Sequence, residues 1–408
     1  PLFEPNWSQI GELDATIHLF RDWLVEQKIA GLSHEVHRIA DLSPVLIVTI
    51  EGTGPGEVIF YSHLDKQPST PELWSEGLHP LKAVRRDPWL YGRGSVDDGY
   101  GGYLCATSIR LLQEAEIPHP RCIMIIETCE ESGSFDLPPY LHELTDHLGN
   151  PDMIVVMDSG GPDYDHVWMT EALRGLVSGT LSVKVSHEGI HSGNSGGSVP
   201  SSFRIQRILL DRVEDSTTGR ILVPEMHVDI SEEVRQKAES LKEIVGDSIW
   251  KPFPTVDNLR QVSKSTEDMI ISMNWEPTLS IIGADGIPSV QDAGNVLRTN
   301  TDLKLSFRIP PGVDSQTAIS AVKSILEENP PYGSEVSFTP DSAADGFRAP
   351  PLSETISDAI HDASNQLTGL PPLAIWTGGT IPFMAMMQAK YPEAMFLCTG
   401  SSGPGNNA

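Results

Sequence analysis

Short apolar runs alternate with helical patterns from residue 11 to residue 157, and this alternation limits the possible folds most strongly. Residues 11–27 and Tyr103–Glu116 have the apolar spacing of helices. Runs with the length and composition of buried strands cover Val45–Ile50, Val58–Tyr61, Ile123–Ile126 and Met153–Met157. Such alternation is typical of an α/β fold. We therefore predict a mixed, mostly parallel sheet flanked by helices.

The pattern changes near Ser178, where apolar and polar residues begin to alternate as in a half-exposed strand. The predicted elements that follow are a helix at Ser202–Val213, a strand at Leu303–Pro310, a helix at Ser315–Glu328 and a strand at Glu335–Phe338. A strand-and-helix pattern that occurs twice is typical of a ferredoxin-like αβ sandwich.

We predict that this sandwich is a separate domain inserted into the first one. It would cover residues 179–347, with an insertion at about 214–274 that contains an exposed helix. Residues 1–178 and 348–408 would then form the two parts of a catalytic domain. A chain of 408 residues is long enough for two such cores.

The charge and composition exclude several classes of protein. Acidic residues outnumber basic ones by 56 to 28, which opposes binding to nucleic acid or to an anionic membrane. No apolar run approaches the length of a membrane span, and the N-terminal stretch lacks a signal-peptide pattern. We therefore expect a cytoplasmic protein. The four cysteines lack metal-site spacing and are predicted to be buried free thiols.

Three of the predicted strands are followed closely by residues that can bind a metal ion. They are His63 and Asp65 after the second run, Glu130 and Glu131 after the third, and Asp158 after the fourth. In open α/β sheets, ligands bind at the carboxyl ends of the strands. Histidine and carboxylates are the ligands that zinc accepts, so these positions together predict a metal site.

Each of these clusters alone has an ordinary explanation. A His-x-Asp triplet is common on surfaces, and a lone aspartate such as Asp158 often begins a turn. The adjacent Asp97 and Asp98 would repel each other unless a cation compensated them, but Asp98 could also cap the helix that starts near Tyr100. The agreement of all clusters favours the metal site.

The sequence resembles the zinc metallopeptidases that include carnosinase, cytosolic non-specific dipeptidase, bacterial glutamate carboxypeptidase, aminoacylase and succinyl-diaminopimelate desuccinylase. The resemblance covers nearly the whole chain. It rests on seven motifs in the family's order, namely YSHLDKQP, LYGRGSVDDG, ETCEESGS, MDSGG, IHSGNSGGSVP, FRIPPG and TGGTIP.

The resemblance implies a site with two Zn²⁺ ions, for which Mn²⁺ or Co²⁺ could substitute. His63 and Asp158 would bind one ion, Glu131 would bind the other, and Asp97 would bridge both. In relatives the last ligand is a histidine in a stretch that resembles Thr399–Ala408. We expect that this sequence stops before that ligand, that the ion at Glu131 binds weakly, and that the activity of this form is impaired.

The resemblance also implies roles in catalysis and substrate binding. Asp65 would orient His63, and Glu130 would be the general base that takes a proton from the attacking water. His191 matches a lid-domain histidine that serves the partner's active site in dimeric relatives, so a homodimer through the lid domain is expected. Substrate contacts are expected from Asn295, Arg308, Gly379 and Thr380.

Three hypotheses for function follow. The first is a dipeptidase or carboxypeptidase that hydrolyses the amide bond next to an amino acid. The second is an N-acyl amino acid deacylase with the same machinery, and the third is a non-catalytic scaffold. Trp376 stands where dipeptidase relatives have a carboxylate-binding arginine, and Gly99 stands where a lysine is usual, so a plain dipeptide with a free carboxylate is less expected. Trp376 itself favours a more apolar substrate group.

Overall fold

The computed structural model describes residues 4–251, 253–263 and 265–406. The first residues of the N-terminal stretch, two residues of the predicted insertion and the last two of Thr399–Ala408 lie outside these ranges. The chain forms two compact units. Unit 1 comprises the described parts of Pro1–Glu171, Ala349–Ile375 and Ile381–Ala408, and unit 2 comprises those of Ala172–Arg348 and Trp376–Thr380.

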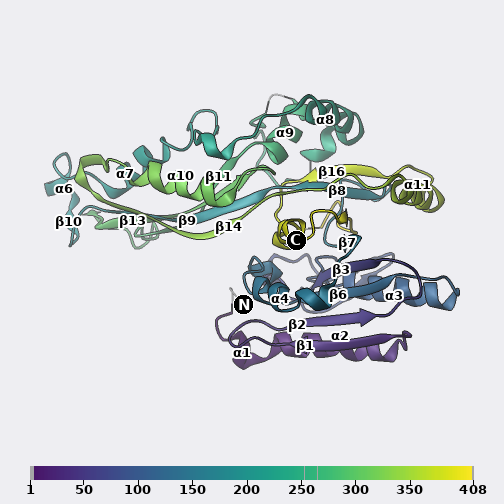
Figure 1. Cartoon of the computed structure of the whole chain (residues 1–408). Coiled ribbons are helices and arrows are strands. Elements are labelled where there is room, and N and C mark those ends of the chain that lie inside the picture. Colours follow the sequence, from purple (N-terminus) through teal and green to yellow (C-terminus); the bar gives the residue numbers. More distant parts are fainter. Residues whose placement is uncertain (1–3, 252, 264, 407–408) are drawn as a thin grey trace. The chain divides into compact units, whose positions relative to one another are not determined.

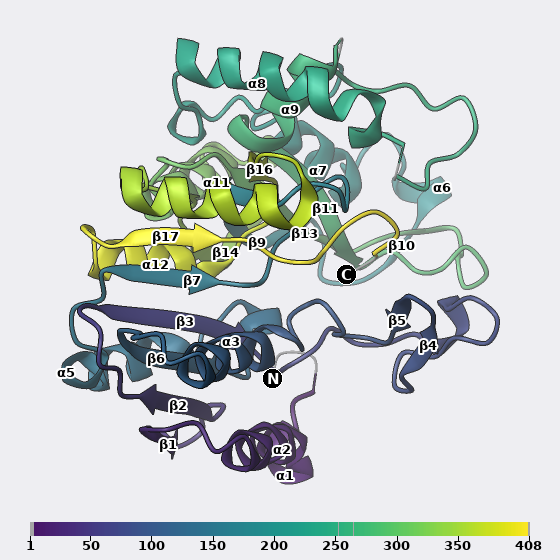
Figure 2. The ribbon, with the colours of Figure 1, turned by 90° about the vertical axis from the view of Figure 1, so that its right-hand side faces the viewer.

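Unit 1 is built on a six-stranded sheet, in which the strands follow the order β1-β2-β6-β3-β7-β17 (Figure 2). Their bounds are β1 Leu32–His37, β2 Val45–Ile50, β3 Glu57–His63, β6 Arg121–Glu127, β7 Met153–Val156 and β17 Met395–Cys398. The pairs β6–β3, β3–β7 and β7–β17 are parallel, whereas β1–β2 and β2–β6 are antiparallel. The predicted mixed, mostly parallel sheet is therefore confirmed.

Helices pack on both faces of this sheet. Helix α2 (Glu12–Glu26) and helix α3 (Gly101–Glu114) share one core cluster with strands β2 and β6, because their apolar residues recur at helical spacing. On the other face, Phe383 of α12 (Pro382–Lys390) stacks on Tyr61 of β3 with ring centroids 3.9 Å apart. The remaining helices of unit 1 are α1 (Trp7–Ile10), α4 (Leu137–Glu143), α5 (Thr145–Leu148) and α11 (Glu354–Thr368).

Unit 2 contains an antiparallel sheet of four strands in the order β11-β13-β9-β14 (Figure 1). The strands are β9 Gly175–Lys184, β11 Thr278–Asp285, β13 Asn300–Ile309 and β14 Glu335–Ala344. Helices α7 (Ser202–Leu210) and α10 (Ser315–Glu327) pack on this sheet and share its core. This order of strands and helices is that of a ferredoxin-like sandwich.

The predicted insertion contains helices α8 (Glu232–Val245) and α9 (Thr266–Trp275). Helix α8 is exposed on one side only, because it buries Val234, Ala238 and Leu241.

The smaller elements of the chain are α6 (Ser192–Ser195) and the strands β4 Val84–Arg86, β5 Trp89–Tyr91, β8 Trp168–Leu173, β10 Ile190–His191, β12 Val296–Leu297, β15 Phe347–Arg348 and β16 Leu373–Thr377.

The unit borders differ from the predicted ones at three places. The first border lies after Glu171 instead of 178, the second lies after Arg348 instead of 347, and the short segment Trp376–Thr380 belongs to unit 2. The segment joins unit 2 because Thr380 donates a hydrogen bond to the carbonyl of Arg174, and Arg174 donates one to the carbonyl of Gly378.

Two further observations concern composition. All four cysteines are buried and free, as predicted. In the described ranges, none of the helices combines the length and the apolar character needed to cross a membrane.

Candidate metal centre

Parallel pairing places the functional residues of unit 1 at one edge of the sheet. Strand β3 ends at His63, and its parallel neighbour β6 ends at Glu127, which is the register partner of His63. Strand β7, on the other side of β3, ends at Val156, two residues before Asp158. The carboxyl ends of parallel strands lie together, so the segments that follow them meet.

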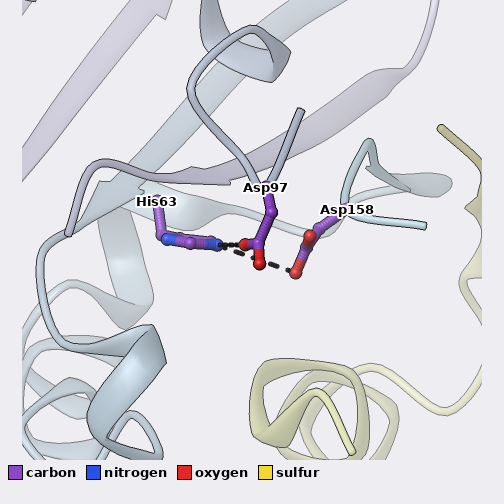
Figure 3. A group of neighbouring side chains, drawn as sticks. All are labelled: His63, Asp97 and Asp158. Atoms are coloured by element: carbon purple, nitrogen blue, oxygen red, sulfur yellow. Dashed lines mark ion pairs between the residues drawn. The ribbon is translucent and has the colours of Figure 1, made fainter. Parts of the chain in front are cut away.

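His63 is completely buried, and its two ring nitrogens have different surroundings. Nδ1 lies 3.1 Å from the backbone carbonyl oxygen of Asp65, to which it can donate a proton. Nε2 is buried without a hydrogen-bond partner, and it lies 3.2 Å from Asp97 Oδ1 and 3.7 Å from Asp158 Oδ2 (Figure 3). A proton held on Nδ1 leaves the lone pair of Nε2 free for a cation.

His63, Asp97 and Asp158 form a group that fits a divalent cation. One ligand atom from each side chain lies within 4.8 Å of the others. One imidazole nitrogen and two carboxylate oxygens suit zinc, and the two carboxylates would repel each other unless a positive charge lay between them. The structure thus brings together three of the four predicted metal ligands.

The fourth predicted ligand, Glu131, lies outside this group and is held by Gln67. The backbone N–H of Gln67 donates to Glu131 Oε1 at 3.1 Å, and its side-chain amide donates to Oε2 at 2.7 Å. Sequence reasoning missed Gln67, because its only signal is its place four residues after His63.

Asp65 fixes the segment that carries both glutamates. Its carboxylate accepts the backbone N–H of Glu130 at 3.1 Å and that of Glu131 at 3.0 Å. Its Oδ1 lies 3.5 Å from His63 Nδ1, so the carbonyl of Asp65 is the closer partner of the imidazole. Asp65 therefore contacts His63 and also organises the next loop.

Glu130 has the surroundings of a proton acceptor. Its Oε2 lies 4.0 Å from His63 Nε2. Burial raises the pKa of Glu130 well above its usual value, and nearby carboxylates such as Asp158 add to this rise, although His63 opposes it. A carboxyl group with a raised pKa is a stronger base once it is ionised, which suits proton transfer near neutral pH.

The other ionisable groups of the centre are also perturbed. Burial alone would lower the pKa of His63, but its contacts with Asp65 and Asp97 outweigh burial and raise that pKa. The contact with His63 lowers the pKa of Asp97, whereas burial raises those of Glu131 and Asp158. Opposed shifts of this kind are common at functional sites.

Asp98 does not cap a helix. Helix α3 begins at Gly101 with Tyr100 at the cap position, and the side chain that accepts a first-turn hydrogen bond is Ser62, whose hydroxyl binds the N–H of Gly102 at 3.1 Å. Both carboxylate oxygens of Asp98 are buried without a hydrogen-bond partner, and burial together with Asp158 raises the pKa of Asp98 to about 7. The alternative explanation of the Asp97–Asp98 pair as a capping turn is therefore wrong.

Tyr100 is a second residue that sequence reasoning missed. Its hydroxyl donates to the carbonyl of Met157 at 2.7 Å and accepts the backbone N–H of Ser401 at 2.9 Å. Tyr100 thus fixes the backbone next to Asp158. No residue pattern could have shown this link, because it joins segments that are far apart in sequence.

The remaining predicted site residues belong to unit 2. His191 is exposed, and its Nδ1 accepts the backbone N–H of Gly193 at the start of α6. The carbonyl of Asn295 accepts the N–H of Ser192. Arg308 donates to the hydroxyl of Thr380 at 2.6 Å, whereas Gly379 is exposed.

Trp376 does not present an apolar surface. Its side chain is buried in unit 2, where it packs edge to face on Trp275 with ring centroids 5.3 Å apart. The expectation that Trp376 favours an apolar substrate group therefore has no support from its surroundings.

Comparisons with known proteins agree with this geometry. The pattern of peptidase family M20/M25/M40 matches residues 59–408. The chain is 24% identical to the cysteinylglycine-S-conjugate dipeptidase of Corynebacterium striatum over 92% of this chain and 81% of that protein. It is 26% identical to the Beta-Ala-His dipeptidase of Mus musculus over 90% of this chain and 75% of that protein.

A solved structure shares the fold. An M20 family metallo-carboxypeptidase from Sulfolobus solfataricus superposes with a TM-score of 0.80, at 19% identity, over 97% of this chain and 88% of that chain.

Proposed function

This chain belongs to peptidase family M20/M25/M40 and is a hydrolase, and on that basis we propose that it is a di-zinc dipeptidase or carboxypeptidase with Glu130 as its general base. The observation that carries the proposal is the convergence of His63, Asp97 and Asp158 on one point, with Glu130 beside them.

The proposed ligand set divides two zinc ions between neighbouring side chains. His63 and Asp158 would hold one ion, Glu131 would hold the other, and Asp97 would bridge them. When bound, zinc would supply a Lewis acid that acidifies a water molecule and polarises the scissile carbonyl. Asp65 and Gln67 keep the ligands in place through the hydrogen bonds described above.

Glu130 moves the proton in the proposed mechanism. Its carboxylate would take a proton from the attacking water and deliver it to the nitrogen of the leaving amine. The support for this role is its burial beside His63 together with its raised pKa.

The proposed substrates are small peptides. The relatives named above are dipeptidases for cysteinylglycine conjugates and for Beta-Ala-His. We propose that Arg308 binds the substrate's carboxylate, since a guanidinium can form two parallel hydrogen bonds to it. Thr380 already accepts a hydrogen bond from Arg308, and Asn295 and Gly379 are the further proposed contacts.

We also propose a homodimer formed through unit 2, in which His191 acts in the partner's site. An exposed histidine whose Nδ1 is fixed by Gly193 supports this role. If His191 acts in the partner's site, a mixed dimer of one His191→Ala and one Glu130→Gln subunit contains one site in which both residues are intact. Mixing the two variants therefore restores part of the activity. No restoration in a mixture that forms mixed dimers refutes the role of His191.

An activity panel tests the main proposal. The full chain is incubated with Zn²⁺ or Mn²⁺ and with dipeptides or N-acyl amino acids, and Glu130→Gln is the matched control. Turnover of dipeptides that is lost in Glu130→Gln supports the proposal. Turnover of acyl compounds alone indicates the deacylase, and metal binding without turnover of any amide indicates the scaffold.

A further inference from the structure

Lys66 lies under the loop that carries Asp97. Its Nζ donates to the backbone carbonyl of Asp97 at 3.2 Å. Its methylene groups pack against Gly94, because a Cβ atom at that position would lie 2.1 Å from Lys66 Cδ. The N–H of Gly99 donates to the carbonyl of Gly94 at 2.9 Å, which closes the loop around the lysine side chain.

The loop can take this shape only with glycine at position 94. Its backbone angle φ is +71°, a value that residues other than glycine rarely adopt. Lys66 also occupies the space that a side chain at position 94 would need. Lys66 thus forms the interior of the loop.

The charge of Lys66 also faces the acidic centre. The carboxylates of Asp65, Asp97, Asp98 and Glu131 all interact electrostatically with its ammonium group. These carboxylates come from three separate segments and would repel one another without a nearby cation. The ammonium therefore offsets repulsion at the point where the segments meet.

We infer that Lys66 is a positioning residue, which holds the loop at the Asp97 carbonyl so that the Asp97 carboxylate faces His63 Nε2 before a metal ion binds. This inference rests on the proposed function. It assigns no contact between Lys66 and the metal or the substrate.

Charge and positioning have opposite effects on metal affinity, which makes the inference testable. If Lys66 contributed only its charge, its removal would lessen the repulsion of a divalent cation and tighten metal binding. If Lys66 positions Asp97, its removal weakens metal binding. Loss of groups that orient metal ligands usually costs about 10- to 100-fold in affinity.

The experiment measures the affinity of the full chain for Zn²⁺ by competition with a chelating dye. Lys66→Met keeps the length of the side chain but removes the charge and the donor. Lys66→Arg keeps both, and Lys82→Met replaces an exposed lysine of the same unit as the control. We expect the Kd of Lys66→Met to rise by about tenfold or more, with Lys66→Arg closer to the wild type and Lys82→Met unchanged.

Thermal unfolding in chelator shows whether each variant is folded. If Lys66→Met does not fold, Lys66→Gln, which keeps an N–H donor, takes its place in the titration. Weaker Zn²⁺ binding by folded Lys66→Met, or by Lys66→Gln where it takes its place, supports the inference, and unchanged or tighter binding by that variant overturns it. If the wild-type chain binds no Zn²⁺, the proposed function itself is refuted. This outcome differs from the one that refutes the inference about Lys66, in which the wild type binds Zn²⁺ and Lys66→Met binds it equally well or more tightly.

Discussion

Glu127 is a fully buried carboxyl group at the end of β6, and the stability of the protein should depend on its protonation. The hydroxyls of Tyr61 and Ser134 donate to its Oε1 at 2.5 and 2.9 Å, whereas its Oε2 has no hydrogen-bond partner. Burial raises its pKa to about 7 from an ordinary value of 4.5, despite these two hydrogen bonds.

The size and sign of the effect follow from this shift. A pKa that is higher in the folded state means that the folded chain holds a proton which the unfolded chain has released. The stability from this group is fully present below about pH 4.5 and is lost as the pH rises to about 7. The rise of the pKa from 4.5 to about 7 corresponds to roughly 3 kcal/mol, since a tenfold change in an equilibrium constant is about 1.4 kcal/mol.

Glu127→Gln removes this dependence, because an amide does not ionise but can still accept the Tyr61 hydrogen bond. Urea unfolding in chelator at about pH 4.5 and 7.5 measures the free energy of unfolding. The difference in unfolding free energy between Glu127→Gln and the wild type is measured at each pH. We expect this difference to favour Glu127→Gln by roughly 3 kcal/mol more at the higher pH than at the lower pH. Glu26→Gln, at an exposed position of α2, is the control. Equal pH dependence in wild type and Glu127→Gln contradicts the raised pKa of Glu127.

Three further predictions concern the centre and its support. Glu130→Gln should lower kcat by about 10²- to 10⁴-fold while Zn²⁺ affinity is retained, and a variant with normal kcat contradicts its role as base. Gln67→Leu should weaken Zn²⁺ binding by about 10- to 100-fold, because Glu131 loses a donor, and an unchanged Kd refutes this. Phe383→Ala should lower the free energy of unfolding by about 3–5 kcal/mol, because it empties the buried space beside Tyr61. Leu367→Ala, at an exposed position, is the control and should cost little, so equal losses in the two variants refute this prediction.

Local patterns predicted many elements of this fold, but they did not indicate β1, β11 or β17, and long-range pairing lay beyond them. The run Val45–Ile50 is β2 to the residue, since six consecutive buried residues leave little ambiguity. The antiparallel pairing of β2 with β6 depends on contacts between segments that are far apart, and no periodicity encodes it. The assignment of Trp376–Thr380 to unit 2 likewise arises from hydrogen bonds to Arg174.

The same distinction applies to the site. His63, Asp97 and Asp158 could be predicted to meet because each follows a strand or a glycine-containing turn at one sheet edge. Lys66 and Gln67 could not be singled out, because their partners are set by how two loops fold over the segment after β3. The hydrogen bonds that hold Glu131 on Gln67 have the same origin.

The most direct test of the account is anomalous X-ray scattering at the zinc edge from crystals of the full chain grown with Zn²⁺. We expect a strong difference peak within bonding distance of His63 Nε2 and of carboxylate oxygens of Asp97 and Asp158. Zinc bound elsewhere, with those three side chains free of metal, would contradict it.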